Sequence, residues 1–113
     1  MLTNKEIALK TAETLNEKKG SDVIILDISD LSSYADFLVI ASGNNDRHID
    51  SLADEVEDKL VNDGIIPRNI EGQAASGWIL MDYGDIIVNV FSKEQRQYYN
   101  IEQLWSDGRL VSA

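Results

Sequence analysis

The sequence contains no cysteine, one proline and one histidine among its 113 residues. Without cysteine it can form neither disulfide bonds nor thiolate metal sites, which fits a reducing, cytoplasmic setting. A single histidine excludes a histidine-rich metal site. No apolar run reaches the roughly 20 residues that cross a bilayer, and the first ten residues lack the basic and apolar segments of a leader. We therefore expect one cytoplasmic domain over residues 1–113 that folds without disulfide bonds or structural metal ions.

Basic residues are also scarce. The 10 Lys and Arg residues face 20 Asp and Glu residues, which gives a formal net charge of -10. The longest basic cluster is Lys18-Lys19, so the chain lacks the cations that attract phosphate backbones or anionic lipid. Sequence-specific nucleic-acid binding and membrane binding are therefore disfavoured. An acidic surface suits a basic protein partner, because complementary fields speed encounter, although acidity also keeps a small protein soluble.

What the chain does have is a strongly apolar hairpin. Residues from Gly77 to Phe91 predict two strands around a turn at Tyr83-Gly84-Asp85. In the first strand one row is Trp78, Leu80 and Asp82, and the other is Ile79, Met81 and Tyr83. A half-solvated strand would alternate apolar with polar residues, whereas both of these rows carry large apolar side chains. Both faces of the hairpin are therefore expected to be covered.

The rest of the chain predicts helices and strands in alternation. In order, we expect a capped helix from Thr3 to Lys19, strands at Val23–Leu26 and Asp36–Ala41, a helix from about Asp46 to Gly64, an edge strand at Ile65–Ile70 around Pro67, a loop at Gly72–Gly77, the hairpin, a short helix from Ser92 to Tyr98 or Tyr99, and one or two turns to Trp105. This order predicts a mixed α/β (α+β) fold with a mixed sheet of about five strands and two long helices.

Two helices cover about one face of such a sheet, because each spans roughly 10 Å of a width of about 24 Å. The second face is therefore expected to stay largely uncovered, with an exposed apolar patch typical of a partner site. On this face Trp78 is a hot-spot candidate together with Tyr83, whereas Trp105 is expected in the core. Arg96 is expected to be a surface arginine, with an acidic partner or a stacked ring as the alternative.

The best candidate for a small-molecule site is the loop Ser42-Gly43-Asn44-Asn45, because free N–H groups at a helix N-terminus suit an anion. A nucleotidyltransferase with such a loop also needs two carboxylates, one residue apart, on the following strand. The sequence has no such pair after Gly43, and it has no Gly-x-Ser-x-Gly elbow. Four other aspartates are expected at strand ends and turns: Asp27, Asp36, Asp82 and Asp85. We expect no enzymatic activity and no cofactor, with a metal-dependent nucleotidyltransferase as the alternative.

The single histidine, His48, falls in the first turn of the second helix, after Asn45-Asp46-Arg47. Side chains in the first turn are mostly solvated or cap the helix. A role as a metal ligand beside Asp46 or Asp50 is therefore disfavoured.

Several segments together resemble a known family. They are Asp27-Ile28-Ser29, Asp36 to Ile40, Ser42-Gly43 with Arg47-His48, Glu71-Gly72, Trp78 to Asp85, Val90-Phe91, Arg96-x-x-Tyr99 and Leu104-Trp105. In this order they are similar to the ribosomal silencing factor family, RsfS, also called Iojap-related proteins. The resemblance implies a fold related to nucleotidyltransferases without their activity. It also implies binding to the fourteenth protein of the large ribosomal subunit, which blocks joining of the small subunit and lowers translation when nutrients run short.

The resemblance also implies a partner-binding surface. Its residues in this sequence are Trp78, Leu80, Met81, Asp82, Tyr83 and Asp85. Because side chains alternate along a strand, these residues cannot all face one partner. Arg47 and His48 match the family pattern as well, either as partner contacts or as parts of a helix cap. A homodimer through the uncovered face is a further alternative, compatible with ribosome binding if the two compete for one surface.

Overall fold

The structure, a computed structural model, describes residues 2–111 as a mixed α/β fold. Its elements are α1 (Asn4–Glu17), β1 (Ser21–Asp27), β2 (Phe37–Gly43), α2 (Asp46–Val61), β3 (Asn69–Gln73), the 3-10 turn η1 (Ala74–Ser76), β4 (Trp78–Asp82), β5 (Ile86–Ser92), α3 (Lys93–Tyr99), α4 (Ile101–Leu104) and β6 (Arg109–Leu110). The predicted class is confirmed. The expected number of about five strands is one too few, because β6 is only two residues long and exposed, and so has no apolar pattern.

The six strands form one sheet in the order β3-β4-β5-β2-β1-β6. β2 and β5 are parallel, and every other neighbouring pair is antiparallel. The predicted hairpin is confirmed as β4 and β5, which the turn at Tyr83–Asp85 joins. The edge strand β3 begins later than predicted, at Asn69 instead of Ile65. Pro67 has no N–H to donate, and pairing starts only after it, where the Arg68 N–H donates to the Asp82 carbonyl over 2.7 Å.

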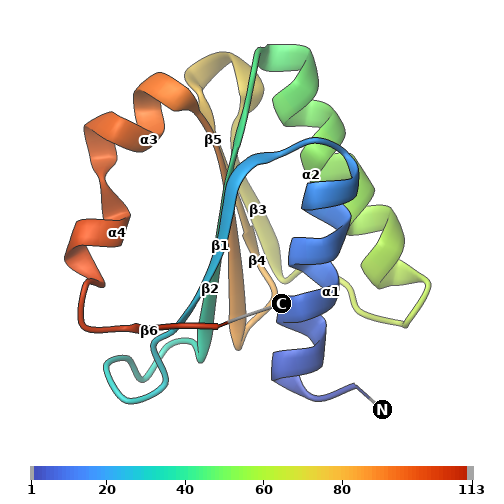
Figure 1. Cartoon of the computed structure of the whole chain (residues 1–113). Coiled ribbons are helices and arrows are strands. Elements are labelled where there is room, and N and C mark those ends of the chain that lie inside the picture. The colour runs from blue at the N-terminus through green and yellow to red at the C-terminus, as the bar shows by residue number, and fades with distance from the viewer. Residues whose placement is uncertain (1, 112–113) are drawn as a thin grey trace.

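Helices α1 and α2 pack side by side on one face of the sheet (Figure 1). Thr3 caps α1 through the predicted capping box with Glu6, and Asn45 caps α2 through the His48 N–H. Their buried faces meet the inner row of the hairpin in one large core. The fully buried members of this core include Leu15, Val39, Ile49, Leu52, Val56, Leu60, Met81, Val88 and Val90. None of the helices in residues 2–111 has the length and apolarity to cross a membrane.

The opposite face carries α3 and α4, on the far side of the sheet from α1 and α2, and the chain then returns to the sheet edge as β6, which pairs with β1 (Figure 1). A second, smaller core lies there, with Leu38, Ile40 and Phe91 buried in the sheet and Ile101 and Trp105 packed against them. The packing of Trp105 against this core agrees with its prediction. The expectation of a largely uncovered second face was wrong, because residues 93–105 pack over β1, β2 and one end of β5.

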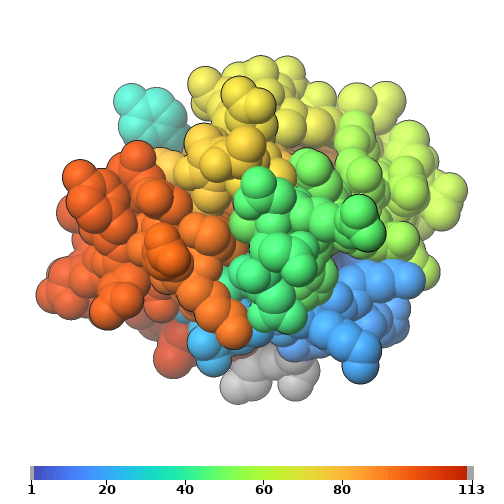
Figure 2. All heavy atoms as spheres, turned by 90° about the horizontal axis from the view of Figure 1, so that it is seen from above, coloured from blue at the N-terminus to red at the C-terminus, as the bar shows by residue number. Residues whose placement is uncertain are grey.

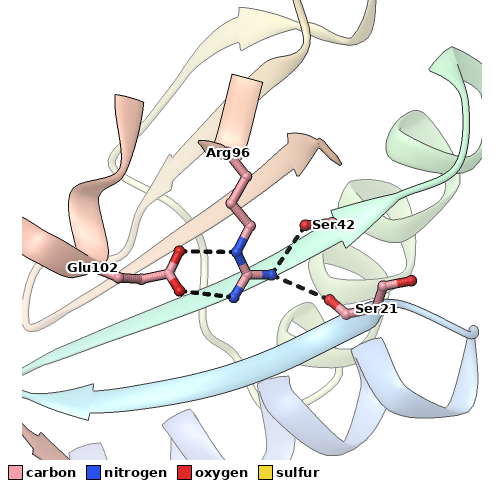
Figure 3. A network of polar contacts seen from close by, with 4 residues as sticks. All are labelled: Ser21, Ser42, Arg96 and Glu102. Atoms are coloured by element: carbon pink, nitrogen blue, oxygen red, sulfur yellow. Dashed lines mark hydrogen bonds and ion pairs between the residues drawn. The ribbon is translucent and has the colours of Figure 1, made fainter. Parts of the chain in front are cut away.

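Arg96 of α3 fixes this cover to the sheet (Figure 3). Its Nε and Nη2 donate to the two carboxylate oxygens of Glu102, over 2.9 and 3.4 Å. Its Nη1 donates to Ser42 Oγ over 3.0 Å and to the Ser21 carbonyl over 3.3 Å. Only 11% of the Arg96 side chain is exposed, so the expectation of a surface arginine was wrong and the alternative of an acidic partner holds. The guanidinium joins α3, α4 and the ends of β1 and β2 in one network.

Candidate protein-binding face

The outward row of β4 begins with Trp78, whose ring is half-buried among other aromatic rings. Its centroid lies 4.9 Å from that of Phe91 and 4.6 Å from that of Tyr99. The indole Nε1–H donates to Asn89 Oδ1 over 3.1 Å. Such packing fixes the orientation of the indole before any partner arrives. The ring therefore serves both as part of the second core and as one wall of an open surface.

A groove of about 270 Å³ lies beside this ring, between β3, β4 and α3. We call it the β4 groove, and its lining residues are Glu71, Gly72, Ser76, Trp78, Leu80 and Tyr99. α3 and α4 leave this part of the second face open. Leu80 is half-buried at its floor, and 45% of Tyr99 is exposed at its wall. The groove is an open apolar surface, as the sequence suggested, but it is narrower than a whole sheet face.

Met81 and Tyr83 belong to the other face of β4. Met81 is fully buried in the core under α1 and α2, so the expectation that it extends a contact surface is corrected by strand alternation. Tyr83 packs half-buried against the same core. Desolvation by burial raises the pKa of its hydroxyl to about 12, and the negative charge of Glu57 adds to this shift. Trp78 and Tyr83 therefore lie on opposite faces and cannot both anchor one flat contact.

The two aspartates of the hairpin have different roles. The Asp82 carboxylate accepts a hydrogen bond of 2.7 Å from the Gly84 N–H, which holds the turn. The Asp85 carbonyl accepts the N–H groups of Asp36 and Phe37, over 2.8 and 3.1 Å, and ties the turn to the start of β2. The Asp85 residue is exposed. Asp85 is thus free to meet a cation at the lower end of the hairpin, whereas Asp82 is already engaged in the turn.

His48 uses both ring nitrogens within the fold. Its Nδ1 accepts the Asn44 N–H over 3.0 Å, and its Nε2 lies 2.9 Å from the Lys18 carbonyl, to which it donates in the matching tautomer. The ring connects the C-terminal end of α1 to the N-terminal end of α2. The sequence predicts His48 in the first helical turn, either as part of a cap or as a partner contact. Nothing in the sequence indicates the long-range hydrogen bond to the Lys18 carbonyl.

Residues of the loop Ser42–Asn45 also form hydrogen bonds that hold the fold together. Ser42 is buried and accepts from Arg96, and the Asn45 side chain caps α2. At Gly43 a Cβ would lie 2.8 Å from Ile49 Cγ1, so glycine lets α2 start close to β2. A polar cavity of about 440 Å³ lies above this loop. Figure 2 looks down on that end, where the start of α2 (green), η1 (yellow) and α3 (orange) meet.

The four aspartates Asp27, Asp36, Asp82 and Asp85 lie near one end of the sheet, where the Asp36 N–H donates to the Asp85 carbonyl. Asp27 accepts from the hydroxyl and the N–H of Ser29, and these bonds hold the pKa of its carboxyl below the usual range. Asp36 accepts from the Asn4 side chain over 3.2 Å. Within residues 2–111, no three His, Asp or Glu side chains come together in a metal-binding group. The aspartates lie at strand ends and turns, as expected.

Two groove residues had not been proposed as site residues. Tyr99 lies in the Arg96-x-x-Tyr99 pattern and Glu71 in the Glu71-Gly72 pattern, so both were visible in the sequence. They reach Trp78 from segments 28 residues apart, which no local periodicity indicates. In the sequence, only the resemblance to the family points to Tyr99 and Glu71 as site residues.

Fold and site together define the class: a small, acidic, mixed α/β protein with an aromatic groove on one side of its sheet. A family model described as "Ribosomal silencing factor during starvation" matches residues 2–113. The chain belongs to this family, RsfS. Bacterial relatives of the chain carry the name of a silencing factor rather than that of an enzyme.

Similar proteins come from several bacteria. A ribosomal silencing factor RsfS of Bacillus subtilis is 36% identical over 110 residues, which cover 97% of this chain and 93% of that protein. One from Chromobacterium violaceum is 38% identical, covering 89% and 83%. A crystal structure of a protein from Chromobacterium violaceum superposes with a TM-score of 0.89 at 36% identity, over 98% of this chain and 92% of that one. More distant relatives, each 26% identical, are "Protein Iojap, chloroplastic" of Zea mays and "Mitochondrial assembly of ribosomal large subunit protein 1" of Mus musculus.

Proposed function

We propose that this chain is a single ribosomal silencing factor domain that represses translation. It binds the large ribosomal subunit through a basic ribosomal protein, the fourteenth of that subunit, and blocks association with the small subunit when nutrients are limiting. Membership of the RsfS family carries this proposal. The name of the mouse relative, which refers to assembly of the large ribosomal subunit, supports the choice of subunit. In this proposal the fold is nucleotidyltransferase-like, but the chain acts in the cytoplasm without catalysis or cofactor.

The proposed contact surface is the β4 groove with the turn below it. Trp78 and Leu80 supply the apolar contact, and Asp85 supplies a negative charge for a basic partner, with Asp82 beside it in the turn. Met81 and Tyr83 support the strand from the core side. The net charge of -10 favours encounter with a basic protein surface.

Trp78 contributes less new burial than an isolated ring would. Burying a whole aromatic side chain removes about 150–250 Å² from water, at about 25 cal/mol per Å². Much of the Trp78 ring already contacts Phe91 and Tyr99 in the free protein. Leu80 lies half-buried at the floor of the groove, so its substitution tests the contact with less damage to the fold than substitution of Trp78, which also packs in the second core.

The test is co-sedimentation of the full chain with isolated large subunits, compared with small subunits. Leu80→Lys removes an apolar contact and places a cation opposite a basic partner. We therefore expect the affinity for large subunits to fall by about tenfold or more. The matched control is Val61→Lys, because Val61 is 49% exposed at the C-terminal end of α2, on the other face. Equal binding by both variants would remove the groove from the proposal. Failure of the unmodified chain to bind large subunits would overturn the proposal itself.

A homodimer through the same groove is compatible with this function. Light scattering over a concentration series detects it, and the Leu80→Lys variant is then expected to stay monomeric. If dimer formation and ribosome binding use one surface, added large subunits will reduce the dimer fraction.

A further inference from the structure

We propose that the β4 groove is a socket for one arginine side chain of a basic protein partner. This inference rests on the proposed function, since it specifies which chemical group of the partner enters the groove. Three observations carry it: a carboxylate that forms no ion pair within residues 2–111, partly exposed aromatic rings and the size of the groove.

The carboxylate is that of Glu71 on the edge strand β3. Glu71 pairs with Leu80 across the β3–β4 ladder, so its side chain lies on the groove side of the sheet. The ion pairs among residues 2–111 join Lys10 to Asp63, Lys18 to Glu55, Arg96 to Glu102, and Arg109 to Asp27 and Asp30. None of them uses Glu71, and the groove lining contains no cation. A negative charge therefore borders an apolar floor without an internal counter-ion.

The aromatic rings favour a guanidinium in particular. Tyr99 is 45% exposed, and its ring meets that of Trp78 at 48°, so the two rings form an angled wall rather than a closed stack. A guanidinium is planar, stacks on aromatic faces, is weakly hydrated and donates two parallel hydrogen bonds to a carboxylate. An arginine can lay its aliphatic stem on Leu80 while its head lies between the rings and Glu71.

Size and backbone support a single side chain as the occupant. At about 270 Å³ the groove is smaller than the roughly 300–1,000 Å³ of typical small-molecule sites. Gly72 has a φ of +82°, and a Cβ there would lie 2.1 Å from the Trp78 carbonyl oxygen. Glycine thus keeps β3 close against β4 and leaves the groove wall without a side chain at this point.

The direct test titrates the full chain with the peptide acetyl-Gly-Arg-Gly-amide and follows the Trp78 indole N–H and the Glu71 amide by NMR. Matched peptides carry lysine or citrulline in place of arginine. We expect saturable shifts at both positions with arginine, weaker binding with lysine and none with citrulline, which keeps the shape but lacks the charge. Shifts that are absent with arginine, or equal with citrulline, would refute the socket.

The second arm measures large-subunit binding by Glu71→Gln, with Glu17→Gln as the control. Glu17 is exposed near the end of α1, on the other face, and its substitution changes the net charge equally. Glu71→Gln is expected to bind large subunits about tenfold more weakly than the control, since it loses a charge-assisted pair. Equal binding by the two variants would refute the socket while the proposed function stands. If the unmodified chain binds no large subunits, the proposed function fails and the peptide titration alone decides the socket.

Discussion

At the scale of single residues, several polar side chains that were candidates for a metal, small-molecule or partner site instead connect secondary-structure elements. His48 connects two helices, Ser42 accepts from Arg96, and Asp82 holds a turn. A sequence identifies such residues but not their partners, because the Lys18 carbonyl is 30 residues from His48 and Arg96 is 54 residues from Ser42. Prediction therefore succeeded for local caps such as Thr3 and failed for long-range bonds.

Replacing His48 with alanine is expected to lower the free energy of unfolding by about 1–2 kcal/mol, because one hydrogen bond to the end of α1 and one to the loop before α2 are lost. Urea unfolding followed by circular dichroism measures the change. The neighbouring exposed residue Arg47 provides the control, and Arg47→Ala should leave stability within about 0.5 kcal/mol. An unchanged midpoint in His48→Ala would show that the bridge contributes nothing.

Tyr83 makes stability depend on pH in the alkaline range. Its folded-state pKa of about 12 exceeds the ordinary value of 10.0, so the folded protein holds this proton more tightly than the unfolded chain. The resulting stabilisation is complete below pH 10 and is lost as pH rises from 10 towards 12. Because the side chain as a whole is only partly buried, we expect only about 1 kcal/mol.

Tyr83→Phe removes this titration. Its free energy of unfolding should therefore fall less steeply than that of the unmodified chain between pH 10 and 12. Below pH 9 the two should agree within about 1 kcal/mol, since the buried hydroxyl has no hydrogen-bond partner among residues 2–111. Parallel curves over the whole range would contradict the burial of this hydroxyl.

At the scale of elements, the cover of the second face is the main departure from expectation. α3 and α4 are short and have no fully buried residues, so their sequences gave no strong amphipathic signal. Their position depends on Arg96, which reaches Glu102 and the ends of β1 and β2. The hairpin, by contrast, followed directly from its two apolar rows, and the strand alternation that placed Met81 in the core was readable in advance.

Arg96→Ala is expected to loosen α3 and α4 and to lower the free energy of unfolding by about 2 kcal/mol, because several hydrogen bonds to a charged group are lost. Hydrogen exchange should accelerate in residues 93–105 more than in α1. Arg96→Lys should restore little, since lysine lacks the planar fork that binds Glu102 at two points.

The control is Lys93→Ala, at an exposed position in the first turn of the same helix. If exchange in α3 and α4 were the same in Arg96→Ala as in this control, the network of Figure 3 would not be what holds the cover.

At the scale of the whole molecule, the sequence predicted the fold class and the family, and the structure and the comparisons confirm both. It did not predict the shape of the open surface, because the β4 groove is assembled from β3, η1, β4 and α3, four elements that meet only in the folded state. The described chain measures 32 × 32 × 24 Å, so a single bound copy has the bulk to keep two large surfaces apart. In the proposed function, this bulk blocks subunit joining without a conformational change in this protein.

The most direct test of the account measures subunit joining. Purified large and small subunits are mixed at a magnesium concentration that favours association, with light scattering as the signal and the large subunits first incubated with an excess of this chain. The account predicts a reduced joining amplitude with the unmodified chain and Val61→Lys, and near-normal joining with Leu80→Lys. Undiminished joining while the unmodified chain stays bound to the large subunit would contradict it.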